Sequence, residues 1–173
     1  VELAIADFDK AISIDPQFTE AYINRGSAYV AWYNYPMALK DFDRALELNP
    51  KNPAIFYQRG LIYYKQKKYT KAASDYTKAI NMGLDHAKVY YNRGNAYFKA
   101  SKWKKAIKDY TKVIELDPKD TEARNNRAMA YQESGQNKKA EADRRILNKM
   151  SGNKFPPIET KKKKKFYSPH KVM

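Results

Sequence analysis

Cysteine is absent from this chain, histidine is rare, and no long apolar run occurs. Without cysteine there can be neither a disulfide framework nor thiolate chemistry. The two histidines, His86 and His170, lack the spacing of metal ligands, and no glycine-rich phosphate-binding loop is present. No apolar run approaches the ~20 residues that a transmembrane helix needs, and no signal-peptide pattern opens the chain. We therefore expect no catalysis, no metal or other cofactor, and no membrane partner.

Positive charge is abundant but unevenly distributed, with a formal net charge of +15. It divides into −4 over residues 1–50, +10 over residues 51–118, +3 over residues 119–150 and +6 over residues 151–173. An asymmetry of this size bears on partners and association rather than on fold. Lysine supplies 26 of the 34 basic residues. That preference disfavours specific phosphate recognition, because arginine makes bidentate contacts to phosphate and lysine does not.

The same residues return every 34 positions along the chain, and the clearest copy spans residues 89–118. The positions that keep the period are Gly26, Gly60 and Gly94; Tyr29, Tyr63, Tyr97 and Tyr131; Ala4, Ala38, Ala72, Ala106 and Ala140; and Asp7, Asp41, Asp75, Asp109 and Asp143. Self-similarity at a fixed period indicates an array of stacked units.

Further residues complete each copy at set spacings. One copy holds Tyr22, Gly26, Tyr29, Ala38, Phe42, Ala45 and Pro50. The next holds Phe56, Gly60, Tyr63, Ala72, Tyr76 and Ala79, and a third holds Tyr90, Gly94, Tyr97, Ala106, Tyr110, Val113 and Pro118. The pattern resembles the tetratricopeptide repeat family over about residues 2–150. The resemblance implies an all-α, right-handed superhelical solenoid of stacked antiparallel helix pairs that acts as a protein-binding scaffold.

The chain divides into about four and a half such units and a tail. Val1 lies inside a partial unit, so we expect a fragment of a longer protein. In the last unit Ala128 replaces the glycine and Arg144 replaces the aromatic residue, as suits a polar unit that ends a stack. The predicted parts are residues 1–18 (partial), 19–52, 53–86, 87–120, 121–150 (capping) and 151–173 (an irregular, basic tail).

Apolar periodicity predicts two amphipathic helices in each unit, and one pair alone cannot bury both apolar faces. Glycine inside a helix costs about 1 kcal/mol relative to alanine. Three glycines in one slot therefore predict helices that cross too closely for a side chain. The predicted helices cover residues 2–14, 19–32, 36–48, 53–66, 70–82, 87–100, 104–116, 121–134 and 137–149.

Four arginines keep the same period as the aspartates. They could form an exposed row that binds nucleic acid or a phosphopeptide, or an internal ladder in which each arginine crosses to an aspartate of a neighbouring helix. The family usually has an apolar residue in this slot, so a charge there needs a partner. We favour the ladder, which would join Arg25, Arg59, Arg93 and Arg127 to Asp7, Asp41, Asp75 and Asp109.

A row of amides lies one position before the arginines. In the family, the first helices of successive units line the concave face, where amides can bond both the N–H and the C=O of an extended peptide. Similar asparagine rows hold peptides in the superhelical repeats of a protein-glycosylating enzyme. The alternative is a groove kept polar for solubility. The predicted groove residues are Asn24, Gln58, Asn92 and Asn126, with Tyr57, Tyr64, Lys88, Tyr91, Asn95 and Phe98 beside them.

One ligand of the family is disfavoured here. The chaperone-binding members clamp a C-terminal carboxylate with two lysines, two asparagines and an arginine. Only Lys88 and Asn92 match parts of that clamp. We therefore do not expect the acidic C-terminal tail of a heat-shock chaperone as ligand, because the first lysine slot holds Ile23, Tyr57, Tyr91 or Asn125.

Lysines also cluster at the turns of two adjacent units and in the tail. We expect them to bind an acidic partner, such as an anionic protein tail like that of tubulin or an acidic subunit, unless they form an ordinary solvated face. The alternative function is association with nucleic acid, although no base-reading motif is present. The basic edge comprises Lys65, Lys67, Lys68, Lys71, Lys99, Lys102, Lys104, Lys105 and Lys108, and the tail adds Lys161, Lys162, Lys163, Lys164 and Lys165.

These interpretations converge on a non-catalytic scaffold in a larger macromolecular complex. Its groove would take a peptide or helix of a partner. We expect an intracellular, cytoplasmic setting, with a cytoskeletal or ciliary (axonemal) assembly as one candidate suggested by the heavy use of lysine, asparagine and tyrosine.

Overall fold

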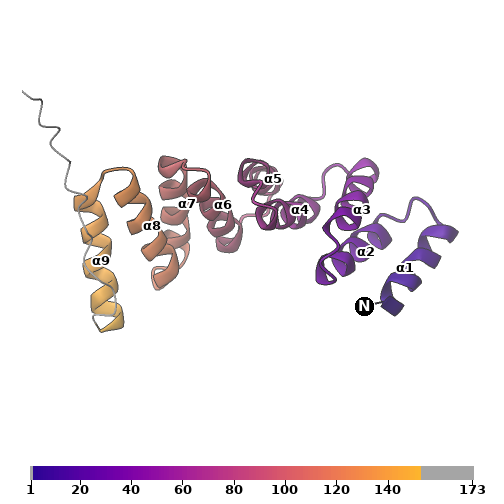
Figure 1. The fold of residues 1–173 in the computed structure, drawn as a ribbon, viewed down its shortest axis with the longest axis horizontal. Helices are drawn as coiled ribbons and strands as arrows, with labels where there is room; N and C mark the ends of the chain where they lie inside the picture. The colour runs from indigo at the N-terminus through magenta and orange to yellow at the C-terminus, as the bar shows by residue number, and fades with distance from the viewer. Residues whose placement is uncertain (1, 153–173) are drawn as a thin grey trace, which may run out of the picture.

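The structure is a computed structural model that describes residues 2–152. Within that range the chain forms nine helices and no strand, arranged as an elongated array with α1 and α9 at opposite ends (Figure 1). The predicted all-α solenoid is confirmed. The helices are α1 Glu2–Ile14, α2 Thr19–Ala31, α3 Tyr35–Leu48, α4 Pro53–Lys65, α5 Tyr69–Asn81, α6 Ala87–Lys99, α7 Trp103–Leu116, α8 Thr121–Glu133 and α9 Asn137–Ser151.

Helix ends agree with the predicted ends within one residue, except at the end of α9, where the helix runs two residues further. Gly152 ends α9 in the left-handed conformation, with φ of 66°. Asn52 caps α4 by accepting a hydrogen bond from the Ala54 N–H at 3.0 Å, and Pro53 follows it at the first helical position. These residues predict helix ends from the sequence because their effect is local. Each one either pairs an unsatisfied backbone N–H or C=O group at the helix end or, like proline, lacks the N–H.

Each helix packs on the next one in the chain. In addition, α2 contacts α4, α4 contacts α6 and α6 contacts α8. The first helices of successive units therefore form one continuous inner layer. Over the described residues the second helices, α1, α3, α5, α7 and α9, make no comparable contacts with one another and form the outer layer. In this same part of the chain, no helix is both long and apolar enough to cross a membrane.

The periodic glycines lie where the two helices of a pair cross. A Cβ atom on Gly60 would come within 2.7 Å of Cε1 of Tyr76, and one on Gly26 or Gly94 would come within 2.8 Å of the equivalent ring atom. Real Cβ atoms do not approach other atoms so closely, so only glycine fits. The predicted close crossing is confirmed, and in the last pair Ala128 is tolerated at this slot, in the unit where Arg144 replaces the aromatic ring.

Left-handed residues shape the turn inside each pair. Tyr33, Lys67 and Ser101 have φ of 59°, 60° and 57°, and Gly135 holds the same place with φ of 78°. The next residue then turns its N–H back to the helix just ended, as Lys68 does toward the carbonyl of Tyr63 at 2.8 Å. Side chains other than glycine are strained in this conformation, and no local sequence signal marked the three positions.

The arginine ladder is confirmed, but its register differs from the predicted one. Each arginine makes a two-pronged contact with the aspartate 16 residues later, in the second helix of its own unit: Arg25 with Asp41, Arg59 with Asp75, Arg93 with Asp109 and Arg127 with Asp143. The expectation that Asp7 belongs to the ladder is wrong, because Arg25 takes Asp9 as its second partner. Asp143 of the last helix is buried, like Asp41, Asp75 and Asp109.

The ladder also joins neighbouring units. The third nitrogen of each arginine, Nη1, reaches back to the preceding outer helix, to Asp9, Asp43, Thr77 or Thr111. The hydrogen bond to Asp75 holds the pKa of Arg59 above its ordinary value. Because the guanidinium groups are used internally, they do not form the exposed row that nucleic acid would need.

Candidate protein-binding groove and basic edge

The predicted groove residues all belong to the inner helices α2, α4, α6 and α8. Asn24 and Lys88 are exposed, and the others are half-buried. The inner groove is defined here by the ten residues predicted from the sequence. The inner groove therefore presents aromatic rings and amides that are partly accessible to a ligand. Aromatic residues are enriched in protein-binding surfaces.

Two of the amides bind phenols of the preceding unit. Nδ2 of Asn92 donates to Oη of Tyr57 at 3.0 Å, and Nδ2 of Asn126 donates to Oη of Tyr91 at 3.1 Å. For Gln58 the equivalent position of the preceding unit is Ile23, whose side chain cannot accept such a bond. The amide ladder thus couples units to one another, and the Oδ1 atoms of Asn92 and Asn126 remain as acceptors for a ligand.

Asn95 connects this ladder to the core. Its Oδ1 accepts hydrogen bonds from Oη of Tyr110 at 2.7 Å and from Nδ2 of Asn126 at 3.2 Å. Both acceptor directions of the amide oxygen are then occupied, so Nδ2 is the donor group of Asn95, and the phenol of Tyr91 lies beside it. Burial raises the pKa of Tyr110 and of Tyr91 above the ordinary value, and both phenols stay protonated and able to donate at neutral pH.

A cavity of about 230 Å³ opens at this point of the inner groove. Sequence reasoning missed two of its walls. Met129 lies one period after Asn95, so the repeat could have identified it, whereas Tyr110 occupies an aromatic position of the repeat that gives no sign of a place in the groove. The lining residues are Tyr64, Asn95, Phe98, Lys99, Tyr110, Asn126 and Met129. Aromatic walls around a few polar groups suit one side chain of a bound peptide.

The basic edge lies at the turns that join α4 to α5 and α6 to α7. All nine of its lysines are exposed. Lys102, Lys104 and Lys105 line a hollow of about 510 Å³ together with Trp103 and with Glu133 of α8. The five tail lysines lie outside the described residues.

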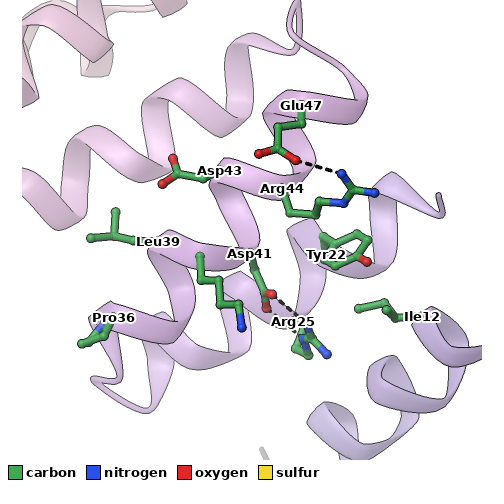
Figure 2. Close-up of a pocket in the computed structure, with 10 residues that line it drawn as sticks. Ile12, Tyr22, Arg25, Pro36, Leu39, Asp41, Asp43, Arg44 and Glu47 are labelled. Carbon is green, nitrogen blue, oxygen red and sulfur yellow. Dashed lines mark hydrogen bonds and ion pairs between the residues drawn. The ribbon is translucent and has the colours of Figure 1, made fainter. Parts of the chain in front are cut away.

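A further hollow, of about 720 Å³, lies among α1, α2 and α3 (Figure 2). Within it Arg25 contacts Asp41 and Arg44 contacts Glu47 at 2.8 Å. The charges of both arginines in this hollow are thus neutralised by carboxylates of the same hollow. Within residues 2–152, no group of three or more acidic, histidine or cysteine side chains is placed to hold a metal ion.

Family models identify the class of protein. Models described as Tetratricopeptide repeat match residues 87–120 and 109–142, and one described as TPR repeat matches residues 34–67 and 60–101. Together with the stacked helix pairs, these matches show that the chain belongs to the tetratricopeptide repeat family. Comparison with curated protein sequences finds no match.

Solved structures with the same fold include two peptide-binding proteins. One is YrrB, a TPR protein with an unusual peptide-binding site, with 26% identity, a TM-score of 0.76 and coverage of 84% of this chain and 75% of that one. The other is the first TPR of Spaghetti (RPAP3) bound to the HSP90 peptide SRMEEVD, with 30% identity, a TM-score of 0.63 and coverage of 70% and 96%.

A third similar structure is MamA (41-end) from Desulfovibrio magneticus RS-1. It has 21% identity and a TM-score of 0.79, and the match covers 90% of this chain and 88% of that one. At this identity the similarity concerns the fold alone. The family, YrrB and the RPAP3 domain support a protein–protein interaction scaffold, and proteins of this family are typically non-catalytic.

Proposed function

We propose that this chain is a non-catalytic scaffold whose inner groove binds a peptide or helix of a partner protein. The observation that carries the proposal is the cavity beside Asn95. It combines aromatic walls with the Nδ2 donor of Asn95 and the Oδ1 acceptor of Asn126. An extended peptide has matching donors and acceptors along its backbone, and its side chains can enter such a cavity.

The groove and the chaperone clamp make different predictions about the ligand. Tyr57 and Tyr91 occupy the first lysine slot of the clamp, and both phenols are hydrogen-bonded within the amide ladder. A positive charge for a terminal carboxylate is therefore missing at these two positions. We expect the HSP90 peptide SRMEEVD, which RPAP3 binds, to bind this chain more weakly than peptides selected for its own groove.

The test is selection of random dodecapeptides displayed on phage, followed by calorimetry with the enriched peptides. Met129→Trp should fill the cavity without removing a ladder bond, because Met129 is 38% exposed. We expect the variant to lose about tenfold in affinity, equivalent to roughly 1.4 kcal/mol. Ser74→Ala, an exposed site on the outer helix α5, is the matched control. Peptides that bind the Met129→Trp variant as tightly as the wild-type chain would overturn the assignment of the groove.

We further propose that the basic edge and the lysines of the tail bind an acidic neighbour within a larger assembly. The net charge of +10 over residues 51–118 supports an anionic partner. An acidic protein segment in a cytoplasmic, cytoskeletal or axonemal assembly would satisfy this requirement. Cosedimentation with microtubules, before and after removal of the acidic tubulin tails by subtilisin, tests that setting; binding unaffected by their removal would contradict it.

A further inference from the structure

Arginines and lysines of this chain have different partners. Within residues 2–152 every ion pair is made by an arginine, and no lysine forms an ion pair with a carboxylate. The ladder arginines already satisfy the buried aspartates. The lysine charge is therefore left for groups outside the chain.

Three of these lysines are positioned by tyrosine rings. Nζ of Lys71 lies over the ring of Tyr63 at 5.7 Å from its centroid, and Nζ of Lys105 lies over Tyr97 at 5.4 Å. The third pair repeats this arrangement, with Nζ of Lys139 over Tyr131 at 5.7 Å. Each lysine is in the first turn of an outer helix, and its ring belongs to the preceding inner helix. We call Lys71, Lys105 and Lys139 the lysine row.

A ladder arginine contacts each of the same rings from its own helix. Cζ of Arg59 lies 5.8 Å from the centroid of Tyr63, and Arg93 and Arg127 repeat the contact with Tyr97 and Tyr131 at 6.0 and 5.8 Å. Each tyrosine ring thus contacts two cations, the ladder arginine inside the unit and the lysine at its surface. A lysine held over an aromatic ring loses less rotamer freedom on binding than one that is fully solvated.

The row begins where the charge of the chain changes sign. In the unit before it, the equivalent slot is occupied by Met37, within the segment of net charge −4. From α5 onward the slot is always lysine, with Lys67, Lys68, Lys102, Lys104 or Lys138 in the residues just before it. The row thus extends the basic edge across a third unit.

We infer that the lysine row is a binding surface for an acidic polypeptide segment, rich in aspartate or glutamate, that runs across three successive units. This inference rests on the proposed function of the basic edge and adds the residues that order it. Glu133 lines the hollow beside Lys105 and opposes such a ligand. Glu133→Gln should therefore strengthen binding.

The rings also distinguish a polypeptide from nucleic acid. Single-stranded nucleic acid gains affinity by stacking bases on accessible aromatic faces. Tyr63, Tyr97 and Tyr131 are half-buried and carry cations, so a base could stack there only by displacing a lysine. The ladder arginines, which could otherwise read base edges, are bound to aspartates. Carboxylates need only the lysine ammonium groups.

The experiment measures binding of a fluorescein-labelled deca-glutamate peptide to the full chain in which Lys161–Lys165 are replaced by glutamine, so that the tail does not contribute. Lys71→Gln, Lys105→Gln and Lys139→Gln together should weaken binding about tenfold, as expected for three partly ordered ion pairs. The control with the same loss of charge replaces the exposed Lys10, Lys40 and Lys51 by glutamine, and should weaken binding much less.

A second set of variants tests the role of the rings. Replacing the three tyrosines by phenylalanine keeps the aromatic faces and should preserve affinity, whereas replacing them by leucine should weaken it while every lysine remains. Far-UV circular dichroism checks that each variant is folded, and the phenylalanine set is the reference if the leucine set is unstable.

The possible outcomes separate the two proposals. If the chain with the intact row does not bind deca-glutamate at all, the proposed function of the edge fails together with this inference. If it binds, but the row and control variants are equally weak, only the inference is overturned. Tighter binding of a mixed-sequence DNA decamer than of deca-glutamate, measured at the same salt concentration, would also overturn it in favour of nucleic acid.

Discussion

Arg59 binds two carboxylates, and comparing them tests whether burial or contact distance sets the contribution of an ion pair to stability. Nε and Nη2 of Arg59 contact Oδ2 and Oδ1 of Asp75 at 2.7 and 3.0 Å, and Nη1 contacts Oδ1 of Asp43 at 2.6 Å. The distances are similar, but the Asp75 side chain is 4% exposed and that of Asp43 is 56% exposed. Physical reasoning therefore predicts very different energies for the same arginine.

Asp75→Asn should destabilise the chain strongly. Removing one partner of a buried ion pair leaves an uncompensated charge and typically costs about 3–5 kcal/mol. Because Arg59 keeps Asp43, we expect a value near the lower limit of about 3 kcal/mol. Asp43→Asn removes an exposed ion pair, and such pairs contribute about 0–1 kcal/mol.

The assay is urea unfolding followed by far-UV circular dichroism at 50 and 500 mM salt. Asp43→Asn should lose what little effect it has at high salt, since exposed pairs are screened, and Asp75→Asn should keep its effect. The double variant Arg59→Met with Asp75→Leu should recover much of the stability, because no unpaired buried charge remains. Equal destabilisation by the two single substitutions would refute the reasoning that burial sets the strength of the ladder.

Three more predictions can be tested by the same unfolding assay. Gly60→Leu should cost about 1–3 kcal/mol by overpacking against Tyr76, and an unchanged melt would count against close helix crossing. Lys67→Gly should stabilise by about 0.5–1 kcal/mol, because Lys67 has φ of 60°. Lys108→Gly, at an exposed position inside α7, should destabilise by about 1 kcal/mol; the same sign for both would contradict the turn geometry. Burial raises the pKa of Tyr76 above its ordinary value, so its contribution to stability is complete below about pH 10, where the unfolded chain begins to lose this proton, and declines above it. Phenylalanine already occupies the equivalent position in the preceding unit, as Phe42. Tyr76→Phe should therefore make the fall in unfolding free energy between pH 9 and 11 shallower. An identical fall would show that Tyr76 does not cause the pH dependence.

Much of the fold could be predicted from the sequence because its causes are local and recur. Pro53 and Gly83 are helix-end signals that act within a few residues, and the 34-residue period sets which residues are equivalent. Gly60 could be assigned to a close helix crossing because its cost in a helix needs a compensating reason. The placement of ten groove residues on inner helices likewise follows from the period and the family resemblance.

The choice of partners could not be predicted in this way. Two aspartates at the right period, Asp41 and Asp7, were equally plausible partners of Arg25 in the sequence, and only the helix crossing brings Asp41 to its guanidinium. The hydrogen bond from Tyr110 of α7 to Asn95 of α6 depends on the distance between these two helices, which decides whether the phenol oxygen reaches the amide. The positive φ of Lys67 depends on the angle at which α5 leaves α4.

The sequence by itself determined the unit, its length, its helices and the sign of the charge along the chain, because these follow from residue order at short range. Tertiary structure alone decided which atoms meet between units: Asn92 with Tyr57, and Lys105 with Tyr97. Such contacts depend on the distance and angle between stacked helices. That geometry arises only when all the units pack together.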